Sequence, residues 1–405
     1  MSCPSSKELC DVSNECAIVV NKDRLDFIRE LETKLFSLGW EDQLLTLQEY
    51  FNAQKIHWSL IELLHCHDKD DIHPGEGIIH LLFDVGFKAE TEIDKDGKPP
   101  LQITTMIHHI GRTHATDFEH KWSRTVSELF RVVYNRYDLN YVDQNGLTHF
   151  HVACMFGCET VVMNFFDAGQ HPNCLPSEPT TCSGVNPPIH LALKYEHYEL
   201  VELLLLNGAD PDALDIKGNS LLYYAVKRLL PNVVDLLLEY GADPTTFVVP
   251  LRKIYKRFFT RMKKSMVTYN LAEVSSVIVI LESLQDHGYK LKRSEALTIF
   301  QFFNKFRFFQ QSCGIKDHLE KKKFVSMAKR TMINPSVSLY KLIKLSKHQP
   351  SKRVTYQDYW EFANSEEHRD MYSRKDCDAY LCKILAKKFF RRWAPFPGFK
   401  QLLQF

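Results

Sequence analysis

The chain has 405 residues and a formal net charge of +1, with 44% hydrophobic and 25% charged residues. This composition is expected for a soluble globular protein of two or three domains. A net charge so close to zero argues against a protein that is drawn as a whole to nucleic acid, so that only local basic patches remain for such contacts.

The N-terminus and the cysteines indicate an intracellular protein. The first 22 residues contain no apolar core of a secretory signal, and the apolar run "SSVIVIL" at 275–281 is too short to span a bilayer. Eleven cysteines without such a signal are expected to be reduced thiols. We therefore expect a cytoplasmic or nuclear protein, or one found in both compartments.

The first 57 residues are expected to precede a repeat array. Residues 1–22 are polar and aperiodic, which predicts a flexible N-terminus. Residues 23–57 read as an N-terminal helical cap, beginning with an amphipathic helix between Asp23 and Gly39. A terminal unit of this kind is atypical because one of its faces must meet water.

A repeat is visible between residues 207 and 244, where "GADP" occurs twice. Gly208 and Gly241 are 33 positions apart, as are Ala192 and Ala225. Leucine-rich runs at helical spacing precede both glycines, which predicts helices that end there in a left-handed residue. Ser220 and Pro231 are expected to begin helices, Ser220 as a cap and Pro231 in the first turn.

The 33-residue unit resembles an ankyrin repeat, whose motif is D-x-x-G-x-T-P-L-H-x-A. The stretch at 140–157 matches with Asp143, Gly146, Thr148, Phe150, His151 and Ala153, and has His149 where the motif has proline. The following units match with Pro188, Ile189, His190 and Ala192, and with Asp215, Gly218, Ser220, Leu222, Tyr223 and Ala225. The resemblance implies an all-α ankyrin solenoid, in which His151 and His190 hydrogen-bond between neighbouring repeats.

Four to five repeats are expected over residues 58–249, with two insertions. "DKDGKPPLQIT" supplies an earlier, weaker unit that aligns Gln102 with His151. The spacing then places one insertion near 104–125, between the two helices of a unit, and a second near 174–186, at a hairpin. Such insertions serve either as binding loops or as neutral loop drift.

Residues 250–405 lack the repeat and predict an α-helical C-terminal domain, with Pro335 and Pro350 at helix boundaries. "DCDAYLCKILAKKFFRRWAPF" (376–396) resembles the tail of ankyrin proteins of hymenopteran insects and poxviruses. In that family the tail leads into an F-box-like PRANC module, which recruits a cullin ubiquitin ligase through a Skp-type adaptor. The leucine-proline helix of that module is missing here, which leaves ligase recruitment in doubt.

No enzymatic activity, metal site or cofactor is expected. The sequence contains no Gly-rich phosphate loop, no G-x-S-x-G, no H-E-x-x-H and no C-x-x-C. The histidines of "HCHDKDDIH" (65–73) and "MIHHIGRTHATDFEH" (106–120) are read as surface residues rather than as metal ligands or pH sensors. Cys154 and Cys158, placed four apart on one helical face, are read as core residues.

Partner-binding residues are expected on the concave face and hairpin tips, because ankyrin proteins bind partners there. The candidates are Lys194, Tyr195, Asp212, Leu214, Ile216, Lys217, Lys227 and Arg228, with His108, His109 and Trp122 as further residues of the first insertion. Leu214 and Ile216 have an alternative reading, in which they pack between hairpins.

Two basic segments have three readings each, namely an anion-binding face, a helix with a solvated basic side and a nuclear localisation signal. The first, at 251–265, carries Arg252, Lys253, Lys256, Arg257, Arg261, Lys263 and Lys264 without an acidic residue. It suits nucleic acid or anionic lipid. The second is "KKFFRRW" (387–393).

The sequence therefore predicts a non-enzymatic scaffold or adaptor that binds a protein partner, and the resemblance of the tail implies that this partner is a substrate recruited to a ubiquitin ligase. Two alternatives stay open: an inhibitor of a Rel-type transcription factor, and association with nucleic acid or anionic membrane through residues 251–265.

Overall fold

The computed structural model describes residues 102–113, 121–174, 184–245, 248–250, 271–305, 315–345, 353–371 and 373–391. The expectations for residues 1–101, for the 251–265 segment and for Pro350 lie outside this part of the chain. The chain divides into two compact units. The first runs to Asp210 and includes Leu214–Gly218, and the second comprises Pro211–Ala213 and everything from Asn219 onward. The predicted boundaries at 57/58 and 249/250 stay predictions.

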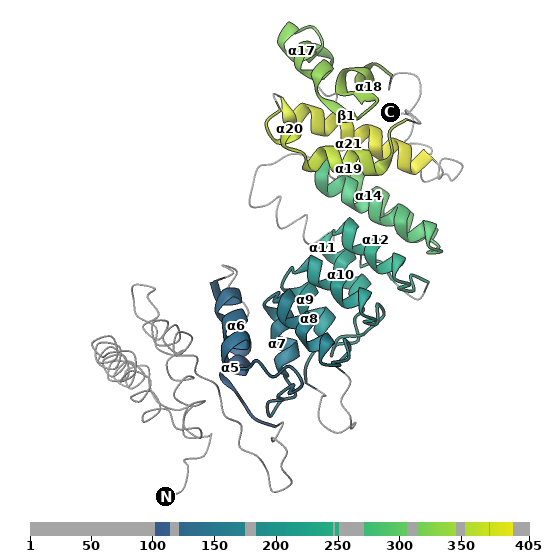
Figure 1. Cartoon of the computed structure of the whole chain (residues 1–405). Helices are drawn as coiled ribbons and strands as arrows, with labels where there is room; N and C mark the ends of the chain where they lie inside the picture. Colours follow the sequence, from purple (N-terminus) through teal and green to yellow (C-terminus); the bar gives the residue numbers. More distant parts are fainter. Residues whose placement is uncertain are drawn as a thin grey trace, which may run out of the picture. The chain divides into compact units, whose positions relative to one another are not determined.

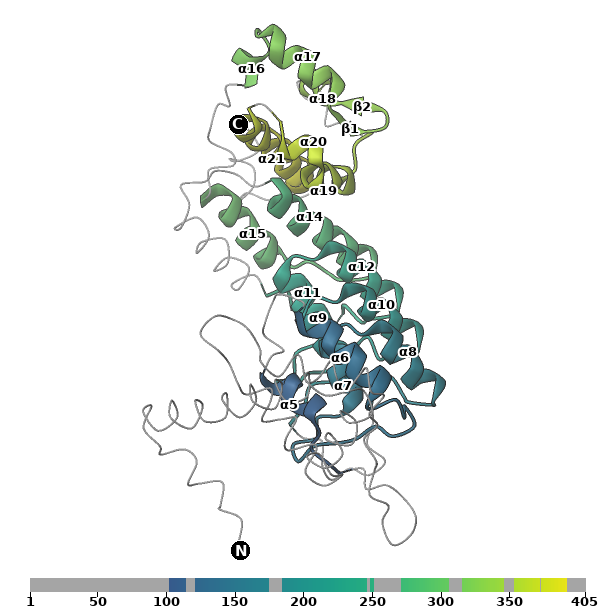
Figure 2. The same cartoon turned by 60° about the vertical axis from the view of Figure 1, so that its left-hand side comes forward.

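The first unit consists of helix pairs, as Figures 1 and 2 show. Its described helices are α5 (Met106–Thr113), α6 (Lys121–Val132), α7 (His149–Met155), α8 (Glu159–Asp167), α9 (Pro188–Lys194) and α10 (Tyr198–Leu206). Within each pair a short first helix is followed by a second helix, and α7 packs on α5 and α9 as well as on α8. This is the ankyrin architecture that the 33-residue spacing predicts.

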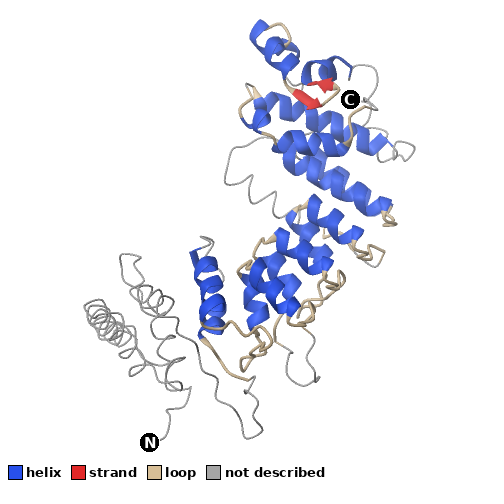
Figure 3. Cartoon of the chain, viewed as in Figure 1, coloured by secondary structure: helices blue, strands red, loops and turns tan. Residues whose placement is uncertain are grey.

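The second unit is also helical, with one small hairpin (Figure 3). Its helices are α11 (Leu221–Arg228), α12 (Pro231–Glu239), α14 (Leu271–Asp286), α15 (Arg293–Lys305), α16 (Ile315–His318), α17 (Lys322–Arg330), α18 (Leu339–Leu345), α19 (Tyr356–Asn364), α20 (Glu366–Arg369) and α21 (Arg374–Phe390). The strands β1 (Met332–Asn334) and β2 (Val337–Ser338) pair antiparallel. Pro335 lies in the turn between them, so it separates α17 from α18 through a hairpin that the sequence did not predict.

Local sequence signals explain where the repeat helices begin and end. Ser220 caps α11 by accepting a hydrogen bond from the amide of Tyr223 at 3.2 Å, and Pro231 occupies the first turn of α12. Gly208 and Gly241 follow α10 and α12 with φ of +87° and +92°. These predictions are confirmed, because only a residue without Cβ adopts that conformation at little cost.

The register predicted for the first repeat is wrong. Thr148 and His151 form a capping box at the start of α7, and Thr105 and His108 have the same spacing and the same bond at the start of α5. His108 therefore occupies the motif histidine position, whereas Gln102 lies before the helix and bridges Val142. Helix α6 is longer than the second helices of the later repeats, with 12 residues against nine in α8, α10 and α12, and Trp122 within it is buried.

A buried helix forms the centre of the C-terminal part of the second unit. α14 contacts α12, α19 and α21, and it is buried from Val274 to Leu281 without interruption. Ser275 and Ser276 fit there because their hydroxyls donate to the carbonyls of Leu271 and Ala272, both at 2.7 Å. The apolar run at 275–281, which is too short to span a bilayer, therefore lies in the core of the protein. Among the described helices, none has the length and hydropathy needed to cross a membrane.

The described part of "KKFFRRW" belongs to the core rather than to an anion-binding face. Phe389 and Phe390 are buried at the end of α21. Lys388 lies over the ring of Tyr356 at 4.4 Å and donates to the carbonyl of Val354 at 2.6 Å. Burial lowers the pKa of Lys387 and of Lys388, so the reading as a packed helix is the one that the structure supports.

Candidate partner-binding surface

The histidines of α5 and α7 belong to a buried network, which excludes them from the surface. Thr105 Oγ1 lies 2.6 Å from His149 Nε2 and 3.0 Å from His108 Nδ1. His108 Nε2 donates to the carbonyl of Tyr141 at 3.1 Å, 33 positions further along the chain and just before the start of the next repeat's first helix. His108 is fully buried and Trp122 is only 8% exposed, so their assignment as partner-binding residues was wrong. His109 is half-buried.

Burial sets the protonation of the motif histidines. It lowers the pKa of His108 and of His151 to about 4 each. The amide of Thr105 donates to Nδ1 of His108, and the amide of Thr148 donates to Nδ1 of His151. Both rings are therefore neutral with the proton on Nε2. The inter-repeat hydrogen bond implied by the ankyrin resemblance is present at His108, through Tyr141, while Nδ1 of His151 bonds Thr148 in its own repeat.

Buried aspartates hold the hairpin turns. Asp143 accepts from the amides of Asn145 and Leu147, and Arg112 pairs with its other oxygen. Burial alone would raise the pKa of Asp143, but these donors outweigh it and keep the pKa below the usual range. Asp215 occupies the same place in a later hairpin, where it accepts from the amide of Lys217 at 2.9 Å. Both turns are therefore held by hydrogen bonds between an aspartate side chain and backbone amides of the same turn.

The outward side chains around Asp215 are apolar. Leu214 is 57% exposed and Ile216 is 56% exposed, while Asp215 between them is buried. The amide of Ile216 donates to Asn186 Oδ1 at 3.1 Å, which ties this hairpin to the preceding one. Lys217 is exposed beside them. Exposure of this extent decides against the reading in which Leu214 and Ile216 pack between hairpins.

Asp212 has a structural contact in the second unit. Its two carboxylate oxygens each lie 3.1 Å from the amide of Asp243, which is 31 positions further along the chain, in the next hairpin. In the first unit, Asn173 Oδ1 accepts from the amide of Asp210 at 2.9 Å in a similar way. Side chains at the hairpin bases therefore link successive repeats, and a partner contact by Asp212 would have to coexist with that link.

The first-helix candidates lie on the ends of α9 and α11. In the first unit, Lys194 is exposed at the end of α9 and its ammonium donates to the Tyr195 hydroxyl at 2.8 Å. In the second unit, the ammonium of Lys227 lies 5.6 Å from the ring of Tyr224, and Arg228 is half-buried. In each of these pairs the lysine and the tyrosine come from the same helix end, so the contact between them is local.

The chemistry of the described thiols is that of core residues. Cys154 and Cys158 are buried and free, and burial raises the pKa of Cys158 to about 11. Cys154 lies in α7 whereas Cys158 precedes α8, so they do not share a helical face as expected. In the ranges that the structure describes, no group of three or more His, Cys, Asp or Glu side chains is arranged to hold a metal ion.

Several contacts were missed by the sequence reasoning. His149 departs from the ankyrin motif, and that departure was the available signal for its bond to Thr105. Asn173 and Asn186 both lie between α8 and α9, and no spacing rule selected them for their bonds to the connection between α10 and α11. His368 and Asp378 form a buried pair with Nε2 and Oδ1 2.5 Å apart. They are ten positions apart on different helices, so helical periodicity does not connect them.

Comparison with known proteins agrees with this geometry. A sequence model described as "Ankyrin repeats (3 copies)" matches residues 114–215 and 176–247. The B-cell lymphoma 3 protein homolog of Mus musculus is 35% identical over 106 residues, which are 26% of this chain and 22% of that protein. Transient receptor potential channel pyrexia of Drosophila melanogaster is 30% identical over 118 residues, which are 29% of this chain and 12% of that protein.

The chain therefore spans less than a quarter of the length of either relative. A crystal structure of the ankyrin repeat domain of Bcl-3, described as a unique member of the IkappaB protein family, aligns at 22% identity with a TM-score of 0.31. That alignment covers 58% of this chain and 86% of the solved one. Residues 114–247 therefore consist of ankyrin repeats, in agreement with the fold described above.

Proposed function

We propose that this protein is a non-enzymatic scaffold whose ankyrin repeats bind a protein partner through the hairpin tip, defined as Leu214, Ile216 and Lys217. Ankyrin repeats imply protein–protein interaction. The observation that carries the assignment to this hairpin is the pair of exposed apolar side chains on a turn held by Asp215 and Asn186. Apolar area that leaves water on binding contributes roughly 25 cal/mol per Å².

The order of this turn favours binding. A loop that is already fixed by internal hydrogen bonds loses little conformational entropy when a partner docks, so more of the contact energy appears as affinity. Lys217 adds a charge at the edge of the apolar pair. Lys194 and Tyr195 are proposed as further contacts of the first unit, and Asp212, Lys227 and Arg228 as contacts of the second.

A Rel-type transcription factor is the partner class that we propose to test first, with this protein acting as its inhibitor. The proposal is supported by the similarity to the mouse B-cell lymphoma 3 protein homolog, and the Bcl-3 domain is described as an IkappaB family member. A cytoplasmic or nuclear location of this chain follows from the same proposal, because a Rel-type factor occupies those compartments.

The experiment is a titration of a purified Rel-homology domain into the full chain, followed by calorimetry. The double variant Leu214→Ser with Ile216→Ser is expected to weaken binding at least tenfold, given the apolar area removed. Leu206→Ser is the control, because Leu206 is 64% exposed at the end of α10 and is not one of the residues of the hairpin tip. Equal binding by the double variant and the control would show that the hairpin tip is not the contact. An absence of binding by the unaltered chain would eliminate the Rel-type partner.

Recruitment to a ubiquitin ligase is a second candidate. It is supported by the resemblance of the tail and by a putative E3 ubiquitin-protein ligase of Plasmodium falciparum, 32% identical over 119 residues that are 1% of that protein. In α21 the side chains of Cys377, Leu381 and Leu385 are buried, so an adaptor would have to contact other residues. Affinity purification of the full chain tests this candidate, which requires a Skp-type adaptor and a cullin to co-purify.

Association of residues 251–265 with nucleic acid or anionic membrane stays a prediction. Those residues lie outside the described part of the chain. Neutralising Arg252, Lys253 and Lys256 should abolish a steep salt dependence of binding if counterion release drives it. A salt-insensitive affinity for duplex DNA and for anionic vesicles would remove this alternative.

A further inference from the structure

A second charged region lies in the C-terminal part of the chain, separate from the ankyrin repeats and from residues 251–265. Between Lys321 and Leu345 the sequence contains six lysines and one arginine, and no aspartate or glutamate. The whole chain has a net charge of only +1. Positive charge is therefore concentrated locally at α17 and α18, on either side of the uncharged β1–β2 hairpin.

Helix α17 separates its apolar and basic residues by face. Phe324 and Ala328, four positions apart, are buried on the inner side. Lys322, Lys323, Lys329 and Arg330 are exposed. Residues three and four apart lie on one side of a helix, so Lys322, Ser326 and Lys329 form one row and Lys323 and Arg330 lie in the adjacent row. The exposed side of α17 is thus basic along both of its turns.

Tyr340 connects this side of α17 to α18. The ammonium of Lys329 lies 5.3 Å from the centre of the Tyr340 ring, and that of Lys344 lies 4.8 Å from it. A hydrogen bond with Lys344 is the main reason that the pKa of Tyr340 lies below its usual value. Lys341 is exposed next to Tyr340. The two helices therefore present one continuous set of cations, which we call the basic face: Lys322, Lys323, Lys329, Arg330, Lys341 and Lys344.

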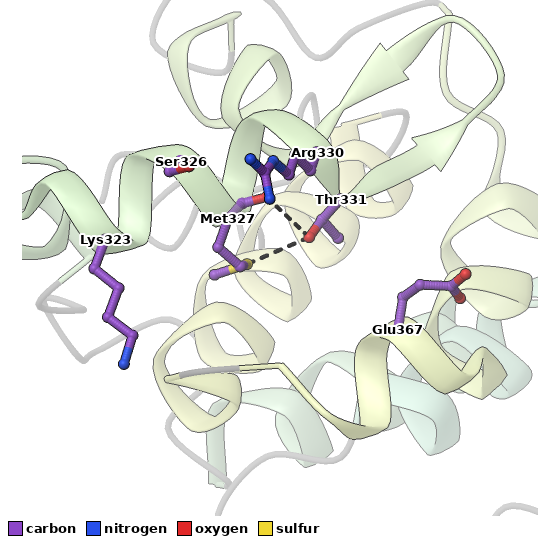
Figure 4. Close-up of a pocket in the computed structure, with 6 residues that line it drawn as sticks. All are labelled: Lys323, Ser326, Met327, Arg330, Thr331 and Glu367. Carbon is purple, nitrogen blue, oxygen red and sulfur yellow. Dashed lines mark hydrogen bonds between the residues drawn. The ribbon is translucent and has the colours of Figure 1, made fainter.

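A hollow marks one edge of the basic face (Figure 4). It is lined by Lys323, Ser326, Met327, Arg330, Thr331 and Glu367. The hydroxyl of Thr331 donates to the carbonyl of Met327 at 3.1 Å, so this residue holds the end of α17. Glu367 comes from α20, on the other side of the hollow, and is exposed. Its carboxylate is the negative charge that borders the cations there.

We propose that the basic face binds an acidic segment of a partner protein. Exposed ammonium and guanidinium groups on two helices match a run of carboxylates, and Arg330 suits bidentate contact with one of them. Nucleic acid fits less well, because single strands bind by stacking bases on aromatic rings, and the Tyr340 ring already has two lysine ammoniums within 5.3 Å of its centre. The surface does not depend on the partner of the ankyrin repeats.

The test uses the full chain and a fluorescein-labelled peptide of alternating glutamate and glycine, with fluorescence anisotropy as the readout. The triple variant Lys323→Gln, Lys329→Gln and Arg330→Gln removes three positive charges from α17. The matched control is Lys290→Gln, Lys292→Gln and Arg293→Gln, which removes two lysines and one arginine from exposed positions at the start of α15. Circular dichroism confirms that both variants fold.

The triple variant should bind the peptide about tenfold more weakly, because each exposed ion pair contributes a fraction of a kcal/mol and three are removed. The control should bind like the unaltered chain, and Glu367→Lys should bind more tightly. Added salt should weaken binding by the unaltered chain. Equal loss in the triple variant and the control, or no binding of the peptide, would overturn the proposal. Tighter binding of a single-stranded or duplex DNA through the same three residues would also overturn it, in favour of nucleic acid.

Discussion

Thr105 and His149 share a hydrogen bond of 2.6 Å although they are 44 positions apart. His149 occupies the position where the ankyrin motif has proline, and its ring is packed edge-on against Phe130, Tyr134 and Tyr141. The exchange of proline for histidine thus replaces a purely local helix start with a polar contact between two repeats. Such a contact is worth most where it is shielded from water, and His149 is 1% exposed.

The coupling between these two residues is measurable. His149→Ala should destabilise the fold by about 2–4 kcal/mol, because it leaves a cavity in the core and removes one of the hydrogen-bond partners of the Thr105 hydroxyl. Thr105→Val should cost less on its own. A double-mutant cycle by urea unfolding should give a coupling energy between about 0.5 and 3 kcal/mol. Strictly additive effects would mean that the hydrogen bond contributes nothing to the stability of the repeats.

Stability should fall as the pH drops from about 6.5 to about 4. His108 and His151 have pKa values of about 4 in the fold, against 6.5 in the unfolded chain, so in this window the unfolded state binds more protons. The stability from these neutral rings is complete above pH 6.5 and is lost as the pH approaches 4, up to about 3 kcal/mol for each ring.

Urea unfolding at a series of pH values measures this dependence. His108→Gln keeps a side chain that can accept from Thr105 and donate to Tyr141 but does not titrate. Its stability should vary less with pH in this window than that of the unaltered chain. Identical pH profiles for the two proteins would show that His108 is not held neutral by burial.

Gly157 should be among the least replaceable glycines of the described repeats. It has φ of +66°, and a Cβ there would lie 2.5 Å from the ring of His197. That ring is fixed because Nε2 donates to the carbonyl of Met155 at 3.0 Å. Gly157→Ala should therefore cost more than about 2 kcal/mol, the sum of a strained backbone and a clash.

Gly208→Ala is the control for Gly157→Ala. Gly208 has φ of +87°, but nothing lies within 4 Å of an added Cβ. Its replacement should cost about 1 kcal/mol from backbone strain alone. The difference between the two thermal midpoints measures the contact with His197, and equal midpoints would exclude a steric role for that ring.

The buried pair of His368 and Asp378 should behave differently in single and double variants. Both side chains are almost inaccessible to water, with Arg374 Nε 3.8 Å from the second carboxylate oxygen. His368→Leu alone should destabilise the fold by about 3–5 kcal/mol, because it leaves a buried carboxylate without its partner. His368→Leu with Asp378→Leu should recover part of that loss. A double variant less stable than the single one would show that the pair is favourable beyond its desolvation cost.

The repeat architecture could be predicted because it depends on local sequence signals, such as the residues that begin and end each helix. Gly208 and Gly241 end helices through backbone geometry, and Ser220 caps a helix through its own hydroxyl. Each of these acts within a few residues. The exposed positions of Leu214 and Ile216 followed from the same register, although two readings of their role remained until their exposure was known.

The register of the first repeat failed for a physical reason. The residues of "KPPLQIT" are similar to those of the ankyrin motif. The position at which a helix begins depends, however, on which backbone amides have a hydrogen-bond acceptor. Those amides are satisfied by Thr105 and His108 instead of by residues near Gln102. The assignment of His108 and Trp122 to the surface failed for the same reason, since burial depends on neighbours that sequence spacing does not specify.

By itself, the sequence determined that residues 140–244 form stacked helix pairs, because the 33-residue spacing recurs in caps, turns and apolar stripes that act locally. Only the tertiary structure decided the contacts between distant positions: Thr105 with His149, His368 with Asp378, and the meeting of α17 and α18 at Tyr340. The physical reason is the range of the interactions. Caps and turns are set by neighbours along the chain, whereas burial, pairing of polar groups and the joining of charged faces depend on how separate elements pack.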